Sequence, residues 1–257
     1  MTAFVLFLAV TTAIGGHGDG PLLRLGGDAS PGVLVNVSPG ARPFDPPDRS
    51  RPTVVFVHGF NPTPHTVHFT MAERLAEAVA RRGGPPINVL AWSWNGATYI
   101  NLNARVNAEN NLSHGRMLAA ALWASGVPPS RTHLIGHSAG AIVAASSART
   151  LNLEYGHPVA QLTLLDPAAY YHHVIFDRLA AGTSAGRVEN YWAPAPSGYG
   201  RAVTQPGVRN VRVDGQTPWL GVVAPIRSAH LDVVRWYLAT VEDRTSATGF
   251  NASVSAN

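Results

Sequence analysis

The sequence contains neither cysteine nor lysine among its 257 residues, and only 13% of its residues are charged. The absence of cysteine excludes disulfide bonds and thiolate metal ligands, but it does not identify a cellular compartment. All 19 basic residues are arginines, and their excess over the acidic residues places the isoelectric point near 9.8. These arginines form no block of like charge and no nucleic-acid-binding motif is present, so the sequence predicts no nucleic-acid partner.

Apolar residues make up 46% of the chain, enough to fill the interior of one α/β domain of this length. At the N-terminus, an apolar run at residues 3–10 precedes small residues and resembles a secretory signal, although no basic residue comes before it. We therefore expect a signal peptide over 1–16 and an exported protein, with a cytoplasmic location as the alternative. We expect an N-terminal arm with a first strand over 17–52, the folded core over 53–243 and a flexible tail over 244–257.

Short apolar runs alternate with segments of helical periodicity along the core. The runs, which we predict to be strands, are residues 33–37, 54–57, 87–92, 133–135, 162–165 and 211–213. The predicted helices are residues 66–82, 114–125 with Ser113 as its N-cap, a segment beginning at 141, and 231–238. This alternation predicts an α/β fold, with a mostly parallel central sheet and helices on both faces. In such sheets, ligands bind at the carboxyl ends of the strands.

The pattern Gly-x-Ser-x-Gly occupies residues 136–140, between a predicted strand and a predicted helix. A strand that turns sharply into a helix can hold a serine on a strained elbow, with its hydroxyl exposed above the sheet. Gly136 and Gly140 fit this turn because side chains there would collide with the strand and helix that meet at it. A structural Gly-rich turn is the alternative, but the surrounding strand and helix favour Ser138 as a nucleophile.

A serine nucleophile requires a general base, and the base requires an acid that orients it. Asp166 and Asp214 each follow a predicted strand directly, and we favour Asp166, which ends an apolar strand just before Pro167. His230 is the candidate base, in a loop ahead of the terminal helix. His137, inside the elbow, is expected to fix the shape of the elbow and to contact substrate.

Two backbone N–H groups are the expected donors to an oxyanion. One belongs to Phe60, in the loop that follows the strand 54–57, and the other to Ala139, directly after the serine. Phe60 is also expected to line the acyl pocket. We expect His58 to brace this loop by hydrogen bonds rather than to act in catalysis.

The remaining histidines show no spacing typical of metal ligands, so the sequence predicts neither a metal nor an organic cofactor. Those expected to be solvated or structural are His65, His68, His114 and His157, and those expected on a surface loop are His172 and His173.

Together, these stretches resemble the pancreatic-lipase-type branch of the α/β-hydrolases over about residues 53–238. The similar stretches are the oxyanion loop at 57–60, the strand ending in tryptophan at 90–92, the elbow at 133–141, and the acid and base motifs at 165–168 and 230–232. The resemblance implies an α/β-hydrolase fold in which Ser138 is the nucleophile, Asp166 the acid and His230 the general base.

The resemblance also implies a lipase or esterase that cleaves carboxylic esters, including acylglycerols or phospholipids, with transient contact to a lipid interface and no obligate protein partner. The chain between acid and base is short, so we expect a small lid that includes residues 217–223, with Trp219 and Leu220 contacting substrate. A buried strand or packed loop is the alternative for that segment. The alternatives for function are an acyltransferase, thioesterase or peptidase using the same site, and a non-catalytic lipid-binding homologue.

Overall fold

A computed structural model describes residues 32–59, 67–94, 104–167, 172–194, 200–213, 227–253 and 255. At the start of four helices, residues 67–70, 104–106, 172–174 and 227–228 are described for the backbone alone. The predicted signal peptide over 1–16 and the predicted lid segment 217–223 lie outside the described residues.

A seven-stranded sheet forms the centre of the molecule, with the strand order β1-β3-β2-β4-β5-β6-β7. The strands are β1 (Val33–Asn36), β2 (Thr53–Val57), β3 (Asn88–Ser93), β4 (Thr132–His137), β5 (Val159–Leu165), β6 (Ala185–Trp192) and β7 (Val208–Arg212). Only β1, at one edge of this sheet, pairs antiparallel with its neighbour, and the other neighbouring pairs are parallel. The predicted mostly parallel sheet is therefore confirmed.

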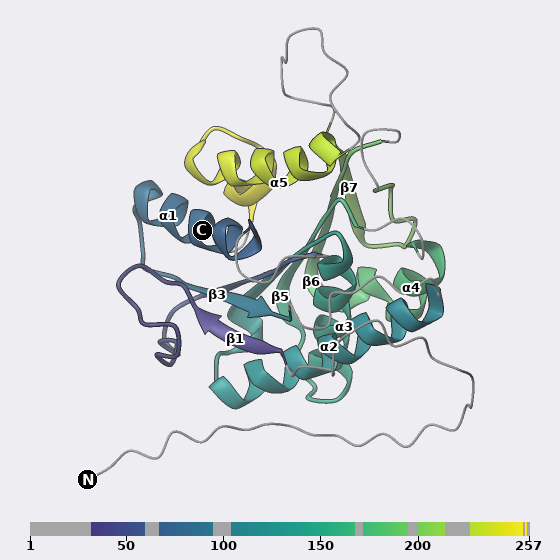
Figure 1. Cartoon of the computed structure of the whole chain (residues 1–257), viewed down its shortest axis with the longest axis horizontal. Coiled ribbons are helices and arrows are strands. Elements are labelled where there is room, and N and C mark those ends of the chain that lie inside the picture. The colour runs from purple at the N-terminus through teal and green to yellow at the C-terminus, as the bar shows by residue number, and fades with distance from the viewer. Residues whose placement is uncertain are drawn as a thin grey trace, which may run out of the picture.

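Helices cover both faces of the sheet (Figure 1). One face carries α1 (Val67–Arg82) and α5 (Arg227–Glu242), and the other carries α2 (Ala104–Ser125), α3 (Ala139–Leu153) and α4 (His172–Leu179). Short 3-10 helices are η2 (Pro129–Arg131), η4 (Ala181–Thr183) and η5 (Gly249–Ala252). This strand order, with crossover helices on both faces, is the α/β-hydrolase fold that the sequence predicted.

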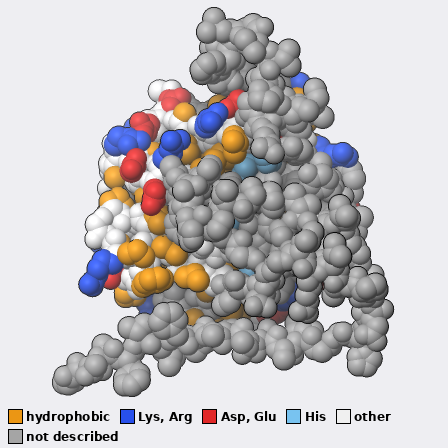
Figure 2. Space-filling view, in the orientation of Figure 1, with side chains coloured by type: hydrophobic (Ala, Val, Ile, Leu, Met, Phe, Trp, Pro, Cys, Tyr) orange, Lys and Arg blue, Asp and Glu red, His pale blue; other side chains and the backbone are white. Residues whose placement is uncertain are grey.

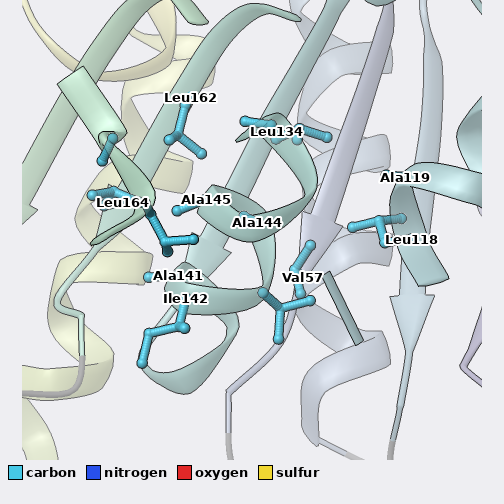
Figure 3. Packing of buried hydrophobic residues seen from close by; sticks show 14 of the residues in the cluster. Val57, Leu118, Ala119, Leu134, Ala141, Ile142, Ala144, Ala145, Leu162 and Leu164 are labelled. Carbon is cyan, nitrogen blue, oxygen red and sulfur yellow. The ribbon is translucent and has the colours of Figure 1, made fainter. Parts of the chain in front are cut away.

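The core on the α3 side consists mostly of small and aliphatic side chains. Figure 3 shows Ala141, Ala144 and Ala145 of α3 against leucines of the strands, among them Leu134 and Leu162. Each of these side chains is fully buried. Because alanine leaves the helix backbone close to the sheet, α3 is held at short range along its length.

Three predictions about where helices begin are wrong. Helix α2 begins at Ala104, well before the predicted cap at Ser113, because Ala108 and Leu112 pack into the core and this burial outweighs the weak helix propensity of nearby asparagines. His172 and its neighbour His173 begin helix α4 instead of lying on a loop. His230 lies in the first turn of α5 and not in a loop ahead of it.

The predicted flexible tail is also wrong for residues up to 253. Phe250, in η5, is 1% exposed and packs against the rings of Tyr237 and His133. Its backbone N–H donates to Thr240 Oγ1, and the Gly249 N–H donates to the hydroxyl of Tyr191. One large aromatic side chain therefore anchors an otherwise small and polar segment against α5 and the sheet.

The surface over α1 and α5 carries both signs of charge. Figure 2 shows arginine and acidic side chains interspersed over the upper left of this face, where the two helices lie. Arg81 contacts Glu242 at 2.6 Å and Glu77 at 3.7 Å.

None of the helices in the described ranges has both the length and the hydropathy to cross a membrane.

Candidate active site

The carboxyl ends of the central strands align at one edge of the sheet. In the parallel register, Val57 of β2 lies opposite Gly136, and His137 of β4 lies opposite Leu165 of β5. Leu165 in turn lies opposite Tyr191 of β6. Residues that directly follow these strands therefore emerge beside one another.

Ser138 lies at the turn from β4 into α3 and has a strained backbone, with φ 56° and ψ −123°. A Cβ at Gly140 would lie 2.3 Å from the carbonyl oxygen of His58 and 2.4 Å from that of Val57. A Cβ at Gly136 would lie 2.4 Å from the carbonyl oxygen of Gly140. The predicted reason for both glycines is therefore confirmed: the strands and α3 approach too closely for a side chain.

Ala139 is the first residue of α3. A backbone N–H at this position has no acceptor within its own helix, and the helix dipole adds partial positive charge there. This N–H is therefore suited to stabilise negative charge that develops beside Ser138. The second predicted donor, Phe60, lies outside the described residues.

Asp166 and His230, which are 64 positions apart in the sequence, are joined by a hydrogen bond of 2.5 Å between Asp166 Oδ2 and His230 Nδ1. Asp166 is fully buried, whereas the side chain of His230 is 13% exposed. The Asp166 backbone also lies in the left-handed region, with φ 41°. Structure thus brings together the acid and base that the sequence predicted. The alternative acid, Asp214, lies outside the described residues.

Two backbone N–H groups hold the other oxygen of the carboxylate. Asp166 Oδ1 accepts hydrogen bonds from Ala193 N at 2.8 Å and from Gly200 N at 3.0 Å. A Cβ at Gly200 would lie 2.3 Å from this same oxygen, so glycine is required for the approach. Sequence reasoning missed both donors, because a backbone N–H leaves no side-chain signal and only the glycine marks the contact.

His58 and Trp94 together fix the loop after β2. The carbonyl oxygen of Gly59 accepts a hydrogen bond from His58 Nδ1 at 2.7 Å, and His58 Nε2 accepts one from the Trp94 backbone N–H at 3.3 Å. The indole Nε1–H of Trp94 donates to the His58 carbonyl at 2.9 Å. His58 is 3% exposed, and these contacts agree with the predicted bracing role. Trp94, which the sequence did not single out, completes the brace, while Trp92 of the predicted motif is buried in the core.

His137 is 2% exposed and contacts His230 through both its ring and its Nε2. These contacts support the predicted structural role within the elbow. Its contact with substrate stays a prediction. Trp219 and Leu220, predicted to contact substrate, lie outside the described residues.

Two of the other histidines whose side chains are described, His114 and His133, are buried, and a third, His157, is at the surface. Burial lowers the pKa of His114 to about 4, and burial, with Arg187 as a lesser cause, lowers the pKa of His133 to about 3. His157 is exposed and stacks on Trp123. Within the described ranges, no three His, Asp or Glu side chains are grouped so that they could hold a metal ion.

No protein-family model matches the chain, and no curated protein sequence matches it. Among solved structures, the chain is similar to an esterase from the archaeon Pyrobaculum calidifontis, with a TM-score of 0.45 and 18% identity over 84% of this chain and 86% of that one. It is also similar to the thermophilic esterase Est2 from Thermogutta terrifontis, with a TM-score of 0.42 and 13% identity over 82% and 87%. Because these TM-scores are below 0.5, the fold assignment depends on the strand order and the elbow.

Proposed function

We propose that the protein is a serine hydrolase that cleaves carboxylic esters through an acyl-enzyme, with Ser138, His230 and Asp166 as its catalytic triad. The observation that supports this most is the 2.5 Å hydrogen bond between Asp166 and His230 at the edge of the sheet where Ser138 has its strained backbone. A buried carboxylate paired with an imidazole beside such a serine is the arrangement that activates a hydroxyl.

In the proposed reaction, Ser138 Oγ attacks the ester carbonyl while His230 Nε2 takes the hydroxyl proton. The tetrahedral intermediate then collapses, the bond to the alcohol oxygen breaks, and His230 returns the proton to the departing alcohol. Water, deprotonated by the same imidazole, attacks the acyl-enzyme. The bond between the acyl carbon and Ser138 Oγ then breaks, His230 returns the proton to this oxygen, and the carboxylic acid is released. Asp166 holds the Nδ1–H, which leaves Nε2 as the basic nitrogen.

We propose that the oxyanion is held by the backbone N–H of Ala139 and that of Phe60. The position of Ala139 at the N-terminus of α3 supports the first of these donors. The brace between His58 and Trp94 supports a rigid loop immediately before the second. Such preorganised donors cost no rearrangement when charge develops on the carbonyl oxygen.

The finer proposal is a lipase or esterase of the pancreatic-lipase type, as the motifs around Ser138, Asp166 and His230 suggest. Nitrophenyl esters of increasing chain length, an emulsified triglyceride and a phospholipid should be compared as substrates. A competing alcohol and a thioester in parallel assays distinguish hydrolysis from acyl transfer or thioester cleavage.

Hydrolysis of a short nitrophenyl ester tests the proposed triad. Ser138→Ala and His230→Gln are each expected to lower kcat/KM about 10⁴-fold or more, and Asp166→Asn about 10⁴-fold. The matched control is Ser130→Ala, an exposed serine in η2 before the amino end of β4, which should retain wild-type activity. Wild-type turnover by a folded Ser138→Ala protein would contradict the proposal.

A further inference from the structure

His137 makes a specific contact with the backbone of the proposed base. Its Nε2 lies 3.2 Å from the carbonyl oxygen of His230, and because a carbonyl only accepts, the imidazole donates this hydrogen bond. The two rings lie with their centroids 4.5 Å apart and their planes 38° apart. The side chain of His137 thus supports both the backbone and the ring of His230.

This contact closes a circuit that joins all three proposed catalytic residues. The Ser138 N–H donates to the carbonyl of Leu165 at 3.0 Å, and Leu165 is covalently followed by Asp166. Asp166 bonds to the His230 ring at 2.5 Å, and the His230 carbonyl accepts from His137 at 3.2 Å. His137 is covalently followed by Ser138, which returns the path to its start.

We infer that His137 is a positioning residue, which fixes the distance between the elbow and the first turn of α5, where His230 lies. This inference depends on the proposed function, because it assigns His137 a role in the reaction of Ser138 and His230. Without the His137 bond, the Asp166 carboxylate still holds one point of the imidazole, but the backbone of His230 can shift relative to Ser138. Displacements of about 1 Å in such a site can cost about 100-fold in rate.

The geometry of the His137 contact favours a positioning role over a role in the stability of α5. Within α5, the carbonyl of His230 lies at a position where it also accepts from the N–H of Val234, four residues on. A carbonyl oxygen has two lone pairs, so loss of the imidazole donor does not leave it without a partner. The helix can therefore remain formed while its first turn becomes less well placed.

The burial of His137 also favours a positioning role over contact with substrate. His137 is 2% exposed, and its Nε2 proton is directed at the backbone of α5. A side chain in this place acts on kcat through the position of His230, whereas a side chain that binds substrate acts on KM.

Two substitutions divide the contribution of the donor from that of the ring. His137→Gln places an amide donor at a similar reach, whereas His137→Phe keeps a planar ring and removes the donor. His157→Gln is the matched control, since His157 is exposed and stacks on Trp123, away from the circuit. The readouts are kcat and KM for a short nitrophenyl ester and the melting temperature of each purified full-length variant.

We expect His137→Phe to lower kcat about 10- to 100-fold with KM within about twofold of wild type, and His137→Gln to recover most of the loss. His157→Gln should leave both constants unchanged. An unchanged kcat in the Phe variant, a change confined to KM, or equal losses in both variants that follow their melting temperatures would overturn the inference. A folded wild type without ester turnover would instead contradict the proposed function and remove the inference with it.

Discussion

Helix α3, which follows the proposed nucleophile, and helix α5, which carries the proposed base, contact the sheet in different ways. Helix α3 is buried along most of its length and presents small side chains to the sheet on one side and to α2 on the other. Helix α5 buries one face, including Val233, Val234 and Tyr237, and leaves its other face in solvent. At its first turn, His230 is held by hydrogen bonds to Asp166 and His137.

Because of this difference, the two reacting side chains are held in place by different kinds of contact. Ser138 cannot move without separating α3 from β2 and β4, because Gly136 and Gly140 bring these backbones into direct contact. His230 can shift through changes in a few hydrogen bonds, because its turn lies at the end of a helix that is covered on one side only. Substitutions on the α3 side should therefore affect the fold first, and those around His230 should affect the reaction first.

Among the glycine substitutions, the largest expected effect comes from Gly140→Ala, on the α3 side. Its Cβ would lie 2.3 Å from a backbone oxygen that cannot rotate away, so we expect a loss of about 3 kcal/mol or more in unfolding free energy. Denaturant unfolding measures this loss. The control is Gly156→Ala, which has φ 71° but no atom within 4 Å of the new Cβ and should cost only about 1 kcal/mol. Equal losses at the two sites would contradict close backbone packing as the constraint on Ser138.

A smaller effect, on the reaction more than on the fold, is expected from Gly200→Ala. The new Cβ would lie 2.3 Å from Asp166 Oδ1, which forces the carboxylate to move and shifts His230 with it. We expect kcat/KM to fall about 10- to 100-fold with a small change in melting temperature. Gly186→Ala in β6, where the atom nearest to the new Cβ is at 3.1 Å, is the control and should keep its activity. A large drop in the melting temperature of Gly200→Ala with a proportionate loss of activity would show instead that Gly200, like Gly140, is required for the fold.

Acid is expected to lower the stability of both faces, through one buried imidazole on each. Because burial lowers the pKa of His114 to about 4 and that of His133 to about 3, the unfolded chain binds protons at these sites before the folded chain does. The contribution of these two neutral histidines to the free energy of unfolding should therefore be complete above about pH 6.5. Below that pH it should fall by about 1.4 kcal/mol per pH unit for each histidine. The loss through His114 ends near pH 4, and that through His133 continues to near pH 3.

Denaturant unfolding between about pH 7.5 and about pH 5 measures this slope. His114→Gln tests the α3 side and His133→Gln the α5 side, and each should flatten the dependence on pH. The exposed His157→Gln variant should keep the wild-type slope. Identical slopes in all four proteins would show that other groups cause the acid sensitivity.

The elbow could be predicted from sequence because its requirements are local. Gly136, Ser138 and Gly140 are within five consecutive positions, between an apolar run and a helical pattern. Asp166 and His230 were also predictable, since each adjoins a recognisable element and the chemistry requires an acid and a base. Their contact at 2.5 Å brings together residues whose separation in the sequence gave no distance information.

Contacts made by backbone groups could not be predicted in the same way. The donors at Ala193 and Gly200 depend on how the chain leaves β6, and neither side chain has chemistry of its own. Phe250 was missed because a single aromatic residue in a small, polar segment has no periodic pattern. The early start of α2 was missed because its stabilising contacts are tertiary and its asparagines have low helix propensity.

Covalent labelling by a fluorophosphonate, followed by peptide mapping, tests most directly whether Ser138 is an activated nucleophile. The predicted result is one label on Ser138 in the wild type, no label in Ser138→Ala, and much slower labelling in His230→Gln with both variants folded. A folded wild type that takes no label, or labelling of Ser138→Ala equal to that of the wild type, would contradict the account.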